Sequence, residues 1–191
     1  MPTYVTEAQV RAKITGVDQQ AARLFLAFHN ALTAFRDEFD IFLSHSIKDA
    51  SLILGVKRLL EEAGKSVYID WIDDRDLERE HVSGETARKL RIRMGQCSTL
   101  IYAYSQSSQR SRWMPWELGY FDGVNGNVAI LPIIPDQGEL DFQKEEYLQL
   151  YPKIDLVGTS LFVNQSQKTE RAPFKSFDDW RKGCDKMRLG E

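Results

Sequence analysis

Residues 111–122, with the sequence SRWMPWELGYFD, gather aromatic side chains around one internal acid, Glu117. Pro115 is well tolerated in the first turn of a helix, so we expect a helix over 114–124 with Glu117 in that turn. The helix dipole would favour the ionised carboxylate, whereas Trp113 and Trp116 would desolvate it. The sequence leaves the balance open. The structural alternative is a carboxylate that binds backbone N–H groups at the helix start.

Several other chemistries lack their sequence signatures. The first apolar run is followed by SHSIKD instead of a glycine-rich phosphate-binding turn, and the chain contains neither HExxH nor GxSxG. Cys97 and Cys184 have no metal-ligand spacing, so we expect two reduced cysteines, with no disulfide and no metal site. These observations disfavour hydride transfer, ATP hydrolysis, esterase chemistry and zinc catalysis.

The elements that must position Glu117 follow from alternating apolar patterns. Short apolar runs predict strands over 39–44, 66–70, 98–104 and 128–133, with a weaker one over 154–157. Helical spacing predicts helices over 52–63, 84–96, 114–124, 144–150 and 174–187. Strands that alternate with helices and are apolar throughout indicate a parallel sheet covered on both faces. We expect an α/β fold, a flavodoxin-like doubly wound sheet of about five strands.

Residues 1–36 are predicted to form an N-terminal helical extension to a main domain over 37–191. Apolar residues recur there at spacings of three and four, with a break expected near Gly16. The sequence does not distinguish packing on the domain from a role in self-association. At the start of the first strand, Asp40 is expected to pair with a basic group.

In a doubly wound sheet, ligands bind beyond the carboxyl ends of the strands. The residues that this rule selects are Ser44, His45, Ser46, Asp70, Trp71, Tyr104 and Ser105, together with the start of the helix that carries Glu117. The charged segment 72–83 is expected to be a long exposed loop near the same edge.

Composition limits the partners and the compartment. The chain has 191 residues and a net charge of -3, which gives no reason to expect nucleic acid or an anionic membrane as a partner. Its apolar runs are strand-sized, far below the roughly 20 residues that span a bilayer. The N-terminus has no secretory pattern, so we expect a cytoplasmic protein.

Two segments resemble the TIR domain family. FDIFLSHS, from Phe39, is similar to the opening strand of TIR domains, and Ser111-x-Trp113-x-x-x-Glu117 matches the Ser-x-Trp-x-x-x-Glu element of the family in order and spacing. The resemblance covers roughly residues 38–135. It is strongest to stand-alone bacterial TIR proteins, including those of the Thoeris anti-phage type, and it assigns 37–191 to the TIR domain.

The resemblance implies that Glu117 is the catalytic residue for cleaving the nicotinamide–ribose bond of NAD, which is a substrate; no cofactor is implied. Glycosidases need a carboxylate pair because a neutral leaving group must be protonated. The nicotinamide ring of NAD is already cationic, so it leaves as a neutral base without being protonated. One ionised carboxylate that faces the developing positive charge is therefore sufficient in principle.

The family also implies a nucleotide site at the strand ends. The expected substrate-binding residues are Ser44, His45, Ser46, Trp71, Tyr104 and Trp113. Trp71 and Trp113 are the candidates for stacking on a planar base. The loop after the second strand departs from the common family pattern because it lacks Leu-x-x-Gly, so individual loop contacts are not transferred.

Three functions remain open. The first is an NAD glycohydrolase or ADP-ribosyl cyclase, used for anti-phage nucleotide signalling or NAD depletion, whose product a downstream effector would sense. The second is a non-catalytic module for TIR–TIR interaction, which need not retain Glu117. The third is a nucleoside or deoxynucleoside glycosyl transferase or hydrolase, which would act on free nucleosides or nucleotides but not on NAD. For the enzyme, self-association is expected to complete the site.

Overall fold

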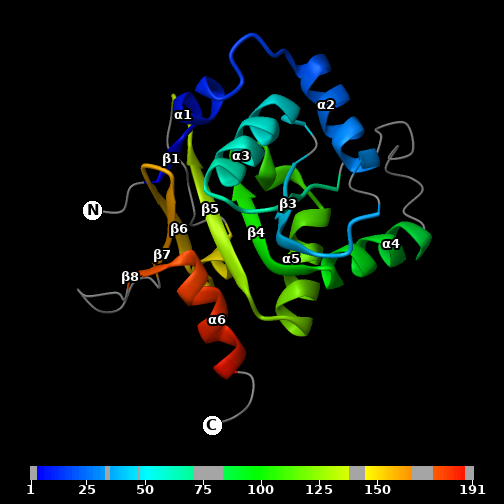
Figure 1. The fold of residues 1–191 in the computed structure, drawn as a ribbon, viewed down its shortest axis with the longest axis vertical. Coiled ribbons are helices and arrows are strands. Elements are labelled where there is room, and N and C mark those ends of the chain that lie inside the picture. Colours follow the sequence, from blue (N-terminus) through cyan, green and yellow to red (C-terminus); the bar gives the residue numbers. More distant parts are fainter. Residues whose placement is uncertain are drawn as a thin grey trace.

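The computed structural model describes residues 4–32, 35–46, 48–70, 84–137, 145–164 and 174–187. Its centre is a parallel sheet in the spatial order β3-β2-β4-β5-β6 (Figure 1). The strands are β2 (Phe39–Ser44), β3 (Val67–Tyr68), β4 (Cys97–Tyr104), β5 (Val128–Ile134) and β6 (Lys153–Val157). This is the flavodoxin-like order 2-1-3-4-5, and it confirms the predicted fold. The strand order reverses between β2 and β4.

Three further strands extend this sheet, and the sequence did not predict them. β7 (Ser160–Asn164) pairs antiparallel with β6, and β8 (Phe174–Ser176) pairs antiparallel with β7. Near the N-terminus, β1 (Val5–Thr6) pairs in parallel with the end of β5. The predicted C-terminal helix therefore starts at Phe177, because the first residues of the expected range form β8.

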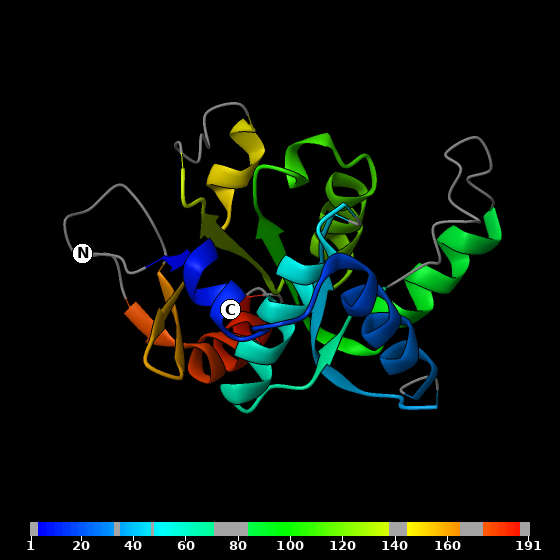
Figure 2. The ribbon, with the colours of Figure 1, turned by 90° about the horizontal axis from the view of Figure 1, so that it is seen from above.

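Helices cover both faces of the sheet. Helices α1 (Glu7–Ala12), α3 (Ala50–Glu62) and α6 (Phe177–Met187) contribute to one apolar core, and α4 (Gly84–Gly95) and α5 (Trp113–Val124) to the other. Figure 2 shows α1 and α3 on the side of the sheet opposite to α5. Short 3-10 turns lie at Ser108–Arg110 and Glu146–Leu150. Across the described ranges, no helix has the length and apolarity needed to cross a membrane.

Helix α3 is the central helix of the first face, and its sequence explains both its burial and its end. Most of its residues from Ala50 to Leu60 are buried. The chain leaves the helix at Gly64 with φ +76°, a left-handed conformation that glycine adopts without steric cost. The N–H of Lys65 then donates to the carbonyl of Leu60. The predicted helix end at Gly64 is confirmed.

The N-terminal segment forms α1 and α2 (Gln19–Leu32), separated by a turn that contains Gly16. Thr6 caps α1 in a capping box with Gln9. Helix α1 packs very closely on α3, because a Cβ added at Gly55 would lie 2.5 Å from the carbonyl oxygen of Val10. The segment therefore packs on the domain, which answers one part of the open question about its role.

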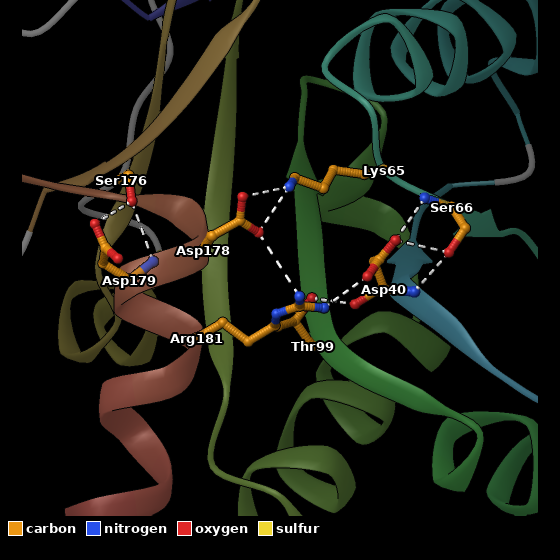
Figure 3. Close-up of polar contacts among 8 residues, drawn as sticks. All are labelled: Asp40, Lys65, Ser66, Thr99, Ser176, Asp178, Asp179 and Arg181. Atoms are coloured by element: carbon orange, nitrogen blue, oxygen red, sulfur yellow. Dashed lines mark hydrogen bonds and ion pairs between the residues drawn. The ribbon is translucent and has the colours of Figure 1, made fainter.

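Asp40 has the structural role expected of it (Figure 3). Its carboxylate accepts hydrogen bonds from the backbone N–H and the hydroxyl of Ser66, and it pairs with Arg181 of α6 at 2.6 Å. Partial burial opposes its ionisation, but the hydrogen bonds from Ser66 and Arg181 outweigh burial and hold the pKa of Asp40 below its ordinary value. Lys65 and Asp178 extend this network. It ties α6 to the amino-terminal end of the sheet.

Candidate active site

The site begins with a hydrogen bond between β2 and α5. Side chains alternate along a strand, so Ser44 points to the same face as Phe42, the face covered by α5. Ser44 is the last residue of β2, at the carboxyl end of the sheet. Its buried hydroxyl donates to Oε2 of Glu117 at 2.5 Å. The structure thus brings together two residues that lie far apart in the sequence and were both predicted to belong to the site.

The placement of Glu117 on its helix differs from the prediction. Helix α5 begins at Trp113, so Glu117 is its fifth residue and lies in the second turn. Pro115 lies within the first turn without opening the helix. The expected benefit from the helix dipole is therefore weaker, because that effect falls off within the first turn.

Burial decides the charge of Glu117. The residue is only 8% exposed, and loss of solvation raises the pKa of its carboxyl to about 8. The hydrogen bond from Ser44 acts in the opposite direction, and the nearby charge of Asp70 raises the pKa further. In the ligand-free protein, Glu117 is therefore mostly neutral at pH 7. Desolvation is the dominant effect.

Asp70 is a second acid at this edge, just after β3. Burial raises the pKa of Asp70 to about 6, while the hydroxyl of Tyr68, which donates to it at 3.3 Å, and the charge of Arg93 act in the opposite direction. Sequence reasoning selected Asp70 by its position after a strand but gave it no role. Its effect on Glu117 makes it part of the electrostatic environment of the site.

Tyr102 was missed by sequence reasoning. It pairs with Ser44 across β2 and β4, and it belongs to the apolar core beneath α5. Burial raises the pKa of its hydroxyl, and the charges of Tyr147, Glu145 and Glu117 add to that effect. Strand alternation could have placed it on the α5 face, but its pairing with Ser44 needed the register of the two strands.

The turn after β2 holds the next two predicted residues. The ring of His45 is half-buried, and its Nδ1 lies 2.9 Å from the carbonyl oxygen of Leu43. A carbonyl only accepts, so Nδ1 carries the proton. Burial lowers the pKa of His45 to about 4, which keeps the ring neutral at pH 7. Ser46 is buried, and its carbonyl accepts from the N–H of Asp49.

The remaining predicted residues have different environments. Tyr104 is fully buried, and its hydroxyl accepts a hydrogen bond from Gln109 at 3.2 Å, so its ring lies beneath the surface of this edge. Trp113 is half-buried at the start of α5. Trp71 and the whole of the predicted loop 72–83 lie outside the described residues.

Trp116 belongs to an aromatic cluster on α5. It meets Trp113 edge to face at 5.3 Å and stacks on Tyr120 at 5.8 Å, and the guanidinium of Arg91 on α4 lies 6.0 Å from both the Trp116 and Tyr120 rings. These contacts fix α4 against α5. They account for Trp116 as a packing residue and for Arg91 as its cationic neighbour.

The arrangement presents a buried carboxyl at the carboxyl edge of the sheet, positioned by a serine hydroxyl. In the described part of the chain, no lysine or arginine forms an ion pair with Glu117, and no group of three or more His, Cys, Asp or Glu residues could hold a metal ion. Once ionised, a carboxylate in such a low-dielectric environment attracts an incoming positive charge strongly. The site is therefore suited to stabilising a cation.

These features define a class of protein, a flavodoxin-like α/β protein with an acidic site at the carboxyl ends of its strands. The chain belongs to the TIR domain family, whose family model, described as TIR domain, matches residues 41–170. That match begins at residue 41 and extends past residue 135, where the segment that carries the resemblance ends.

Two relatives are similar to this chain. A probable 3' cyclic ADP-D-ribose synthase, ThsB', of Bacillus cereus (strain MSX-D12) is 49% identical over 130 residues, which cover 68% of this chain and 66% of that protein. A candidate cyclic ADP-D-ribose synthase, TIR2, of Cytobacillus dafuensis is 36% identical over 83 residues, which cover 43% of this chain and 22% of that protein. The chain thus spans slightly less than two thirds of the first relative and about a fifth of the second.

Proposed function

We propose that this TIR protein cleaves the nicotinamide–ribose bond of NAD and that Glu117 is its catalytic residue. One observation carries the proposal: the Glu117 carboxyl is buried at the carboxyl edge of the sheet, and Ser44 donates to it at 2.5 Å. The relatives named as cyclic ADP-D-ribose synthases support a cyclised ADP-ribose as the product.

The chemistry balances without a general acid. The bond between C1′ of the ribose and the ring nitrogen breaks, and its electron pair leaves with nicotinamide, which becomes neutral. Positive charge then develops on the ribose, where ionised Glu117 stabilises it. In cyclisation, an oxygen of the same ADP-ribose attacks C1′ and loses its proton; in hydrolysis, water does so.

The raised pKa of Glu117 fits this role. Binding a nicotinamide cation beside Glu117 lowers the pKa of the carboxyl, because an opposite charge favours the ionised form. The proton leaves as the substrate enters, and the site then holds a carboxylate that water does not screen. The same burial that makes Glu117 neutral in the free protein strengthens its attraction for the transition-state charge.

Other residues have supporting roles in this proposal. Ser44 positions the Glu117 carboxyl, and His45 and Ser46 line the nucleotide at the turn after β2. Trp113 and Trp71 stack on a planar base, and Tyr104 supports the wall of the site from beneath. Residues 37–191 form the catalytic TIR domain, and residues 1–36 form an accessory extension.

The cellular role rests on the resemblance to bacterial anti-phage TIR proteins. We propose a cytoplasmic enzyme whose nucleotide product is sensed by a downstream effector, and whose copies associate to complete the site. Association predicts that turnover per subunit rises with enzyme concentration. A turnover per subunit that is unchanged on dilution would contradict that part of the proposal.

The deciding experiment incubates purified protein with NAD at high enzyme concentration and identifies the products by chromatography and mass spectrometry. Glu117→Gln is assayed in parallel, since it keeps the shape of the side chain but cannot ionise. We expect nicotinamide and a cyclised ADP-ribose from the wild type only. Cleavage of a free nucleoside or nucleotide without cleavage of NAD would favour a nucleoside glycosyl transferase or hydrolase, and no cleavage would favour an interaction module.

A further inference from the structure

Helix α2 exposes a stripe of large apolar side chains, here called the α2 stripe. Its members and their exposed fractions are Leu24 (68%), Phe25 (52%), Phe28 (64%), Leu32 (66%) and Phe35 (92%). Leu24, Phe28 and Leu32 follow one another at steps of four, and Phe25 lies beside Phe28 on the same side of the helix. Phe35 follows shortly after the helix ends. The four members on the helix thus form one ridge.

The other side of α2 is already occupied. Ala22 and Leu26 are fully buried in the apolar core that also contains residues of α3, and the side chain of Gln19 donates to Asp49 and Ser51. The ring of His29 approaches the carbonyl of Val67 at 3.4 Å. Helix α2 is therefore fixed to the domain at the outer side of α3 (Figure 1). It holds the stripe at a defined place on the surface.

The stripe is large for a surface that remains in water. A phenylalanine side chain can bury about 200 Å², so the exposed fractions of its three phenylalanines correspond to about 400 Å². With the two leucines, the exposed apolar area is on the order of 600 Å², at the upper limit for the largest patch of a typical monomer. An area of this size approaches the roughly 800 Å² that each partner contributes to a stable interface.

We propose that the α2 stripe is an interface with a second copy of this chain, packed about a two-fold axis. The stripe contains no charged residue, so two copies can meet without placing like charges together. Ridges at four-residue steps interdigitate when two helices cross at about -50°, and a two-fold contact needs only a self-complementary patch. The helix lies outside the TIR match at 41–170, so the interface is separate from the family domain and does not depend on NAD chemistry.

A membrane surface is a poorer occupant of the stripe. Helices that lie on membranes carry many lysines and arginines on their polar face. The sequence of α2, QQAARLFLAFHNAL, contains Arg23 and no other lysine or arginine, and the chain has a net charge of -3. A second copy needs no basic residues to bind.

The test is sedimentation velocity over a range of protein concentrations, without NAD. We compare the wild type with the double variant Leu24→Glu/Phe28→Glu and with Ile92→Glu, a control on α4 that replaces an apolar side chain of similar exposure, 50%. We expect a wild-type dimer, a dissociation constant raised at least about a hundredfold in the double variant, and little change in the control. A wild type that is monomeric at every concentration, a double variant with the dissociation constant of the wild type, or equal weakening by the control overturns the proposal.

A second measurement keeps the proposal testable if the double variant does not fold. Under mild oxidation, Phe28→Cys should form disulfide-linked dimers above the wild-type background. Arg23→Cys, at an exposed position that is not three or four residues from any member of the stripe, should not. Equal cross-linking at both positions contradicts the interface. So does flotation of a monomeric wild type with anionic phospholipid vesicles, because the stripe would then bind lipid.

Discussion

Replacing Ser44 with alanine removes the hydroxyl that donates to Glu117, so it tests how this protein controls the charge of its carboxyl. The wild-type pKa of Glu117 is about 8, and the hydrogen bond from Ser44 lowers it. Ser44→Ala should therefore raise that pKa. The ionised fraction, and with it kcat/KM for NAD, should rise at higher pH than in the wild type.

The size of the shift follows from the hydrogen bond. A bond to a charged group contributes about 1.5 kcal/mol, which corresponds to about one pKa unit. At pH 7 the ionised fraction of Glu117, and hence kcat/KM, should fall about tenfold in Ser44→Ala. Near pH 10 the two proteins should differ little, because the carboxyl is ionised in both.

The assay measures kcat/KM for nicotinamide release between pH 6 and pH 10, because the pH profile of kcat/KM reports groups of the free enzyme. Asp70→Asn is the matched control, because it should shift the pKa of Glu117 in the opposite direction. It removes a negative charge that raises the pKa of Glu117, so the midpoint of its profile should move to lower pH. A Ser44→Ala midpoint equal to that of the wild type, or a shift of both variants in one direction, would refute the reasoning.

Three further predictions concern stability. The pKa of Glu117 is raised from 4.5 to about 8 in the folded protein, so the wild type loses folding stability as pH rises through this window. Glu117→Gln cannot ionise and should not lose it. In urea unfolding, the stability of the variant relative to the wild type should therefore increase by roughly 3 to 5 kcal/mol between pH 4.5 and pH 8. A constant difference between the two proteins would contradict this. Gly55→Ala should cost about 1 to 3 kcal/mol and increase amide exchange in α1, because the new Cβ would clash with Val10. Normal protection of α1 would show that it does not pack there. Arg181→Ala should lower the free energy of unfolding by about 1 kcal/mol at pH 7. The loss should become smaller as pH falls through the depressed pKa of Asp40, because the carboxyl is then protonated. A loss that does not depend on pH would argue against the ion pair.

The central sheet was predictable because its strands are short, continuous apolar runs between turn-forming residues. Strand β2 has the predicted limits, Phe39–Ser44, and β6 begins one residue before the predicted start. The strands that were missed depend on contacts outside their own sequence. Val5 is a strand residue only because it pairs with Ile133, and β8 forms because it pairs with the edge of β7.

The sequence predicted the residues of the candidate site better than their pKa values. The sequence motif and the rule of strand ends selected Glu117 and Ser44, and the structure brings them into contact. The sequence could not give the pKa of Glu117, because that pKa depends on burial by α5 and the sheet and on the distance to Asp70. The register of β2 and β4, which places Tyr102 beside Ser44, is likewise a tertiary property.

The most direct test of the central claim is the rate of nicotinamide release from NAD by wild type and Glu117→Gln at pH 9, where the wild-type carboxyl is ionised. Both proteins are first shown to be folded at that pH by circular dichroism. A preorganised charge in such a site commonly contributes a factor of about 10² to 10³ to the rate, so the variant should be slower by at least that factor. Equal rates would show that Glu117 does not stabilise the positive charge that develops on the ribose as nicotinamide departs.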